Sequence, residues 1–166
     1  FVKKYFYALI FILILVPDII LGISFLLLFN YAHIPLGFLS LFISHVTFCI
    51  PFVVLTLYSR FDYIDKNIIA AAQDLGASEW QIYHRILLPL LLPAILAGFL
   101  LSFTLSLDDV VVSYFVAGPG YEILPLKIFS MVRNGVNPEI NALCALLFLV
   151  TLILVFITHY FLHKSP

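Results

Sequence analysis

Four apolar runs, each long enough to cross a lipid bilayer, constrain what this 166-residue chain can fold into. A helix needs about 20 apolar residues to cross the hydrocarbon core of a membrane. The four runs lie at about residues 5–29, 36–58, 86–107 and 142–162. Because 64% of the residues are hydrophobic and only 10% are charged, a soluble domain of this length could not bury them. We therefore predict an all-α fold, a polytopic bundle of membrane helices in a single domain, 1–166.

Proline interrupts three of these runs, at Pro17, at Pro51, and at the pair Pro89 and Pro93. Membrane helices tolerate proline where neighbouring groups satisfy the carbonyl that loses its hydrogen-bond partner. The prolines therefore favour a packed bundle or a transport pathway over simple membrane anchors.

The basic residues predict which side of the membrane each loop faces, since short loops rich in Lys and Arg stay in the cytoplasm. With four crossings, one side carries Lys3, Lys4, Arg60, Lys66, Arg85 and Lys164. The other side carries only Lys127 and Arg133. We therefore expect both termini and the loop 59–85 in the cytoplasm, and the segment 108–141 facing outward.

The segment 65–89 has a helix–turn–helix pattern that is too polar to cross the membrane. Apolar residues at helical spacing predict a first helix that ends at Gly76. Ser78 can cap a second helix, and Gln81 three residues later completes a capping box. Trp80 adds a large aromatic anchor of the kind that dominates protein interfaces. The pattern favours a bent helix pair in segment 65–89, called the elbow below, that docks another protein. The alternative is an amphipathic helix in the lipid headgroups.

Three aspartates lie in or beside the apolar runs, where an ionisable group is costly unless it faces a partner or water. Asp18 follows a proline in the first run and is either functional or a cap for a broken helix. Asp108 and Asp109 end the apolar part of the third run. They line the outer half of a pore if that helix continues to Phe115. They lie at its mouth, or at a merely solvated helix end, if it stops at Leu107.

The outward segment also carries Glu122 and Glu139 against Lys127 and Arg133, and is acidic overall with the two aspartates. Such a field favours a cation. Tyr114 could add a cation–π contact, although an aromatic residue of the membrane interface is the alternative for it.

A fixed spacing runs through the elbow, formed by Ala71, Ala72, Gly76, Ile86, Leu88 and Pro89. It resembles the E-A-A-x3-G-x9-I-x-L-P loop of ABC importer permeases, with Ala70 in place of the glutamate. The resemblance implies a loop that couples the permease to an ATPase through Ala70, Ala71, Ala72, Asp74, Gly76, Glu79, Trp80, Ile86 and Pro89. It also implies that the contact of the missing glutamate is lost or moves to Asp74 or Glu79.

Longer stretches, 44–60, 74–80, 101–132 and 137–143, resemble the permeases of spermidine/putrescine importers. This resemblance implies the type I ABC importer permease fold and a multi-pass protein of the bacterial cytoplasmic (inner) membrane. It also implies polyamine uptake by alternating access. The substrate pathway that we expect comprises Asp18, Ser106, Asp108, Asp109 and Tyr114. Family permeases usually have six spans, so we expect two N-terminal spans to be missing here.

The implied partners are a dimeric ABC ATPase, a second permease subunit, an extracytoplasmic polyamine-binding protein and membrane lipid. The chain has no GxxxxGK[ST] phosphate loop, so ATP and Mg²⁺ are expected on the partner ATPase. We expect no cofactor, no metal and no enzymatic activity in this chain. A net charge of −1 gives no basic surface for nucleic acid.

Two other functions remain open from sequence. One is an ABC permease for another small solute. The other is an intramembrane aspartyl protease in which Asp18 shares a proton with Asp108 or Asp109, although no GxGD signature surrounds them.

Overall fold

The computed structural model of the protein describes residues 2–135 and 138–163, and over this part of the chain it is helical between short connections. The elements are α1 Val2–Leu15, α2 Asp18–Tyr31, α3 Phe38–Asp62, α4 Lys66–Asp74, α5 Glu79–Ile82, the π-helix η1 Tyr83–Leu87, α6 Leu88–Asp108, α7 Val111–Val116, α8 Leu124–Asn134 and α9 Pro138–His163. The all-α fold class predicted from the sequence is confirmed.

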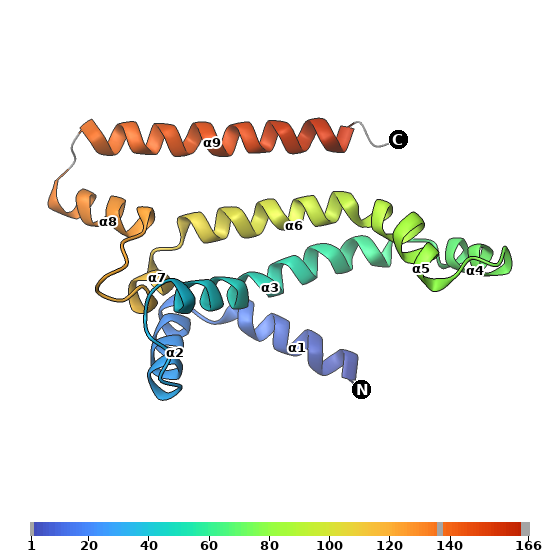
Figure 1. Ribbon diagram of the computed structural model, residues 1–166, viewed down its shortest axis with the longest axis horizontal. Coiled ribbons are helices and arrows are strands. Elements are labelled where there is room, and N and C mark those ends of the chain that lie inside the picture. Colours follow the sequence, from blue (N-terminus) through green and yellow to red (C-terminus); the bar gives the residue numbers. More distant parts are fainter. Residues whose placement is uncertain (1, 136–137, 164–166) are drawn as a thin grey trace.

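Helices α3 and α6 run side by side in opposite directions and form the centre of the molecule (Figure 1). α9 lies along α6 on the side away from α3, and α1 packs against α3. α4 and α5 project as an elbow at one end, whereas α2, α7 and α8 gather at the other. α1 begins and α9 ends toward the end that carries the elbow. The molecule thus has two distinct ends joined by long apolar helices.

Three helical segments are long and apolar enough to cross a membrane: Phe38–Asp62, Glu79–Asp108 and Pro138–Thr158. A fourth crossing exists if α1 and α2 form one broken span, because Tyr7–Leu15 and Asp18–Tyr31 are bent by 105°. The predicted first run, 5–29, is therefore not one straight helix. Pro17 at the break has no N–H to donate, and it disfavours helical geometry in the residue before it.

The third predicted run, 86–107, belongs to a longer helix that continues without a gap from α5 through η1 into α6. Within η1 the N–H of Leu88 donates to the carbonyl of Tyr83, the i to i+5 bond of a π-helix. Pro89 cannot donate to the carbonyl four residues before it, so the α-helical ladder is already interrupted here. The apolar pattern does not predict this turn.

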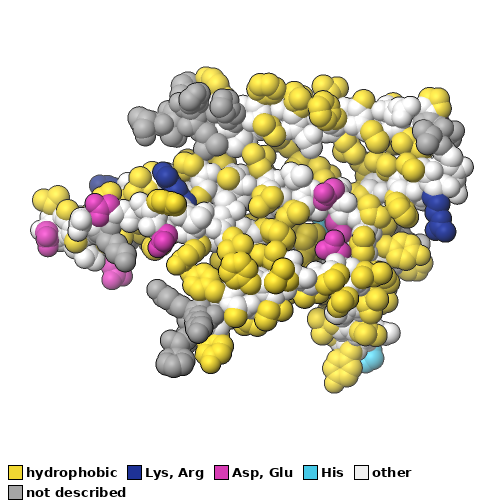
Figure 2. Space-filling view, turned by 180° about the vertical axis from the view of Figure 1, so that it is seen from behind, with side chains coloured by type: hydrophobic (Ala, Val, Ile, Leu, Met, Phe, Trp, Pro, Cys, Tyr) yellow, Lys and Arg dark blue, Asp and Glu magenta, His cyan; other side chains and the backbone are white. Residues whose placement is uncertain are grey.

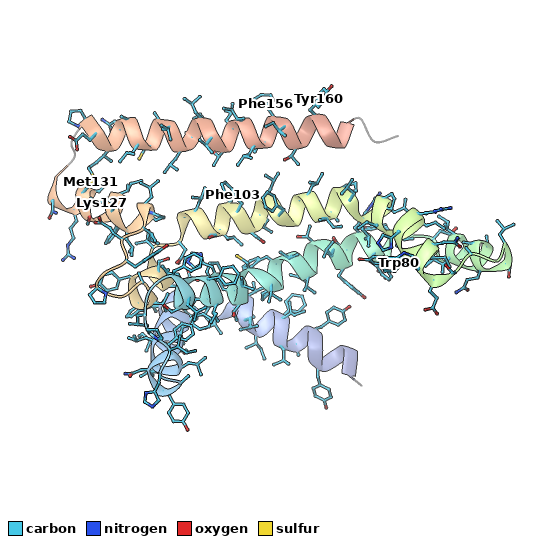
Figure 3. All side chains as sticks on the ribbon, viewed as in Figure 1. Trp80, Phe103, Lys127, Met131, Phe156 and Tyr160 are labelled. Atoms are coloured by element: carbon cyan, nitrogen blue, oxygen red, sulfur yellow. The ribbon has the colours of Figure 1, made fainter. Side chains whose placement is uncertain are left out.

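Buried apolar side chains are concentrated where α2, α3 and α7 meet, in a cluster of Phe25, Phe29, Leu41, Val112, Val116 and Ala117. Elsewhere in the described part of the chain, many large apolar side chains are exposed. On α9, Phe156 and Tyr160 lie on the face turned away from α6 (Figure 3). Apolar surfaces of this extent mark contacts with membrane lipid or with other proteins.

The short α7 packs tightly against α2 through Gly22. A Cβ atom at Gly22 would lie 2.6 Å from Cδ2 of Phe115 and 3.3 Å from Cα of Val112. A glycine at position 22 allows this close approach of α2 to α7.

Candidate functional site: an acidic pocket and a projecting elbow

Three aspartates from two distant parts of the sequence line one pocket between α2, α3, α6 and α7. The pocket has a volume of about 250 Å³ and is lined by Asp18, Phe48, Phe52, Leu105, Asp108, Asp109, Val110, Val111 and Val112. Figure 2 shows acidic side chains set in a hydrophobic surface near the middle of the view. No Lys or Arg of the described residues forms an ion pair with these carboxylates. The pocket therefore suits a cation that also carries apolar segments.

The carboxylate of Asp109 holds the first turn of α7. Its Oδ1 accepts a hydrogen bond from the backbone N–H of Val112 at 3.0 Å. Its Oδ2 accepts from the N–H of Ser113 at 2.8 Å and from the hydroxyl of Ser113 at 2.7 Å. The Asp109 side chain is only 8% exposed. Asp109 is thus mainly an organiser of the pocket wall.

Asp18 and Asp108 are the exposed acids of the pocket. α6 ends at Asp108, and the non-helical residues Asp109 and Val110 connect it to α7. The helix therefore does not continue unbroken to Phe115. It stops one residue beyond Leu107, close to the alternative in which the aspartates lie at the mouth of the pore. Asp18 begins α2, and its carboxylate accepts no hydrogen bond from the described part of the chain.

The three carboxylates neither join a metal-ligand cluster nor hydrogen-bond to one another within the described residues. Within residues 2–135 and 138–163, no group of three or more His, Cys, Asp or Glu is placed to hold a metal ion. Over the same residues, no hydrogen bond joins two of these carboxylates, as a proton-sharing catalytic pair requires.

His45 contacts three residues in or beside the pocket, although the sequence pattern did not single it out. Its Nδ1 lies 2.7 Å from Oγ of Ser106, and its Nε2 lies 3.0 Å from Oγ of Ser113. Nε2 is also 3.5 Å from Oδ2 of Asp109. The sequence signal that could have identified His45 is that it is an ionisable residue within an apolar run. Ser106, expected in the substrate pathway, contacts His45 and is not among the residues that line the pocket.

Tyr114 lies outside the acidic pocket. It borders two adjoining hollows beside α8, of about 310 and 390 Å³, together with Phe129 and Arg133. Lys127 projects from α8 (Figure 3). Its Nζ lies 2.9 Å from Oε1 of Glu122, so this acid of the outward segment is paired. The structure therefore places the three expected aspartates in the lining of one pocket, and neither Ser106 nor Tyr114 is part of that lining.

The elbow forms as the local sequence predicts. Asp65 accepts a hydrogen bond from the backbone N–H of Asn67 at the start of α4. After α4, Gly76 adopts a φ of +79°, a conformation that glycine enters without a steric penalty. The hydroxyl of Ser78 accepts from the N–H of Gln81, and the side chain of Gln81 accepts from the N–H of Ser78. The predicted capping box is confirmed.

Every residue expected in the ATPase-coupling loop lies in the elbow or in the helix that continues from it. Ala70, Ala71, Ala72 and Asp74 are on α4, Gly76 is in the turn, Glu79 and Trp80 are on α5, Ile86 is in η1, and Pro89 is the second residue of α6. Trp80 lies at the end of the molecule that carries the elbow (Figure 3). It is 71% exposed, and its ring centroid lies 3.8 Å from that of His84. The elbow thus presents a preformed aromatic surface.

A comparison with protein families matches residues 1–165 to the family described as "Binding-protein-dependent transport system inner membrane component". The spermidine/putrescine transport system permease protein PotC of Escherichia coli (strain K12) is 55% identical over 153 residues, which cover 92% of this chain and 58% of that protein. PotC of Haemophilus influenzae is 50% identical over 158 residues, covering 95% of this chain and 62% of that protein.

The putrescine transport system permease protein PotI of Escherichia coli (strain K12) is 44% identical over 158 residues, covering 92% of this chain and 56% of that protein. The chain therefore spans less than two thirds of the length of each of these three relatives.

Proposed function

The chain belongs to the family of binding-protein-dependent transport system inner membrane components, and we propose that it serves as a permease subunit of an ATP-driven ABC importer for polyamines. Its relatives are permease proteins of spermidine/putrescine and putrescine transport systems. The observation that carries the polyamine assignment is the acidic pocket lined by Asp18, Asp108 and Asp109.

The chemistry of the pocket matches the chemistry of a polyamine. Alkyl amines are protonated near neutral pH, as lysine is, so a polyamine carries several positive charges separated by methylene segments. The carboxylates of Asp18 and Asp108 can bind ammonium groups, since neither pairs with a Lys or Arg of the described chain. Phe48, Phe52 and Leu105 provide apolar surface for the methylenes between the charges.

The elbow supports the second half of the proposal, coupling to an ATPase in the cytoplasm. Trp80 is a large exposed anchor on a helix whose start is fixed by the capping box of Ser78 and Gln81. α5 continues through η1 into α6, which ends at Asp108. A movement of the elbow is therefore transmitted along one continuous helix to the pocket.

Membership of a family of binding-protein-dependent transport components supports the remaining parts of the proposed importer. ATP and Mg²⁺ bind to the dimeric ATPase, whose closure moves the elbow and shifts the permease between two states, one open to each side. A second permease subunit completes the pathway, and an extracytoplasmic binding protein delivers the polyamine. Both termini of this chain lie in the cytoplasm with the elbow, in agreement with the common end of the molecule toward which α1 begins and α9 ends (Figure 1).

Uptake of radiolabelled spermidine by the complete complex tests the proposal. Asp108→Asn keeps the shape of the side chain and removes its charge. We expect uptake to fall by about tenfold or more, because hydrogen bonds to charged groups contribute about 1.5–3 kcal/mol. Glu122→Gln is the matched control, since Glu122 is exposed and paired with Lys127 outside the pocket.

Unchanged uptake by Asp108→Asn would contradict the role of the pocket. Absence of spermidine and putrescine uptake by the unaltered complex, together with uptake of an uncharged or anionic solute, would overturn the polyamine assignment and keep the permease family.

A further inference from the structure

His45 bridges the break between α6 and α7 with side-chain hydrogen bonds. Ser106 lies on α6 before the break, and Ser113 lies on α7 after it. Both hydroxyls are within 3.0 Å of a ring nitrogen of His45, which projects from α3. The side chain of His45 is only 16% exposed. One ring thus joins three helices at the point where the backbone ladder of α6 ends.

The hydrogen-bond pattern assigns which ring nitrogen carries the hydrogen. The hydroxyl of Ser113 donates to Oδ2 of Asp109, so it offers only lone pairs to His45. Nε2 of His45 must therefore carry a hydrogen, which points toward Ser113 and, at 3.5 Å, toward Asp109. In the neutral ring Nδ1 then accepts from the hydroxyl of Ser106. All three side chains are satisfied in one arrangement.

This network fixes the part of the chain that carries two of the pocket acids. α6 ends at Asp108, and Asp109 and Val110 connect it to α7. All three of these residues line the pocket. No backbone hydrogen bond joins α6 to α7 across this described junction, so side-chain hydrogen bonds and packing hold it. Asp109 fastens the start of α7, and His45 fastens both α7 and α6 to α3.

We infer that His45 is a positioning residue for the acidic pocket, which by joining α6 and α7 across their break holds Asp108 and Asp109 in the arrangement that binds the cation. This inference rests on the proposed function and extends it to a residue that does not line the pocket. His45 acts through its neighbours and does not contact the transported solute.

Two variants at position 45 separate hydrogen bonding from packing. His45→Phe keeps an aromatic ring beside Phe48, whose ring centroid lies 5.1 Å from that of His45, but it removes both ring nitrogens. His45→Gln loses the ring but keeps a donor and an acceptor. Both are prepared in the complete complex, with spermidine uptake and hydrogen–deuterium exchange of residues 111–116 as the readouts.

We expect His45→Phe to lower uptake by about 30-fold and to speed exchange in α7 by a similar factor, since two hydrogen bonds of about 1 kcal/mol each are lost. His45→Gln is expected to recover most of both. A purely structural role predicts the reverse order, because Phe preserves packing better than Gln. If His45→Phe does not assemble, Ser106→Ala removes one hydrogen bond without changing the ring, and we expect about a fivefold loss of uptake.

Wild-type uptake by His45→Phe overturns the inference, whether or not exchange in α7 changes. A loss of uptake that His45→Gln does not recover also overturns it. If the unaltered complex takes up no polyamine while exchange in α7 responds to His45→Phe as expected, the proposed cargo is wrong and the link across the break stands.

Discussion

The acidic pocket and the elbow are built in opposite ways. The elbow is held by contacts between residues a few positions apart, such as the reciprocal hydrogen bonds of Ser78 and Gln81. The pocket joins Asp18 from the start of α2 to Asp108 and Asp109 at the end of α6. One end is therefore specified by local sequence, and the other by how the helices pack. Substitutions at the two ends should differ in their effects for this reason.

The largest effect should come from adding a side chain at Gly22, where α2 and α7 are in close contact. We expect Gly22→Ala to destabilise the complex by about 1–3 kcal/mol, because the added Cβ meets Phe115 and the backbone of Val112. Asp18, one turn earlier on α2, should then leave the pocket and uptake should fall. The melting temperature of the purified complex and spermidine uptake measure the two effects.

Gly98→Ala is the matched control for this helix glycine. A Cβ at Gly98 would lie 3.4 Å from Cγ1 of Val53, which is an ordinary contact. Equal stability and equal uptake of the two alanine variants would contradict packing of α2 on α7 as the element that places Asp18.

A smaller effect is expected at the turn of the elbow. Gly76 has a φ of +79°, and no atom lies within 4 Å of the position that a Cβ would take, so only the backbone conformation opposes a side chain there. Gly76→Val should cost about 1–2 kcal/mol and lower the population of the native elbow by about 5–30-fold. ATP hydrolysis by the complex, stimulated by the loaded binding protein, is the measurement.

Gly76→Asn should behave almost as the unaltered chain, because asparagine tolerates the left-handed conformation better than other residues do. If Val and Asn at position 76 reduce hydrolysis equally, the conformation of the turn is not what matters for coupling.

The smallest effect should follow the loss of the helix cap. Ser78→Ala removes the acceptor for the N–H of Gln81, at a cost of about 1 kcal/mol. The elbow is exposed, so the change should raise amide exchange at the start of α5 by about fivefold and leave the pocket unaffected. Ser78→Thr should restore the protection. A change of exchange in α7 in Ser78→Ala would show that the stability of α7 depends on the cap of α5, contrary to this expectation.

The same contrast explains what the sequence could predict. Ser78, Gln81 and Gly76 act on their immediate neighbours, so their roles can be predicted from a short stretch of sequence. The charges of Asp18, Asp108 and Asp109 inside apolar runs mark them as candidates. Their meeting in one pocket depends on the bend at Pro17 and on the packing of Gly22, which composition does not reveal.

His45 shows why the rest of the site could not be predicted. Its three partners lie more than sixty positions away in the sequence and are reached only through the packing of α3 on α6 and α7. Ser106 and Tyr114 show the converse, since proximity in sequence to Asp108 does not place either in the lining of the pocket.

The division of labour between the two ends is tested most directly by measuring ATP hydrolysis and spermidine uptake in the same proteoliposomes. The vesicles contain the complete complex with either Asp108→Asn or Gly76→Val. We predict that Asp108→Asn loses uptake but keeps the hydrolysis stimulated by the binding protein, whereas Gly76→Val loses both. Hydrolysis and uptake at unaltered rates in Gly76→Val, or full uptake in Asp108→Asn, would contradict a pocket that selects the cation and an elbow that drives it.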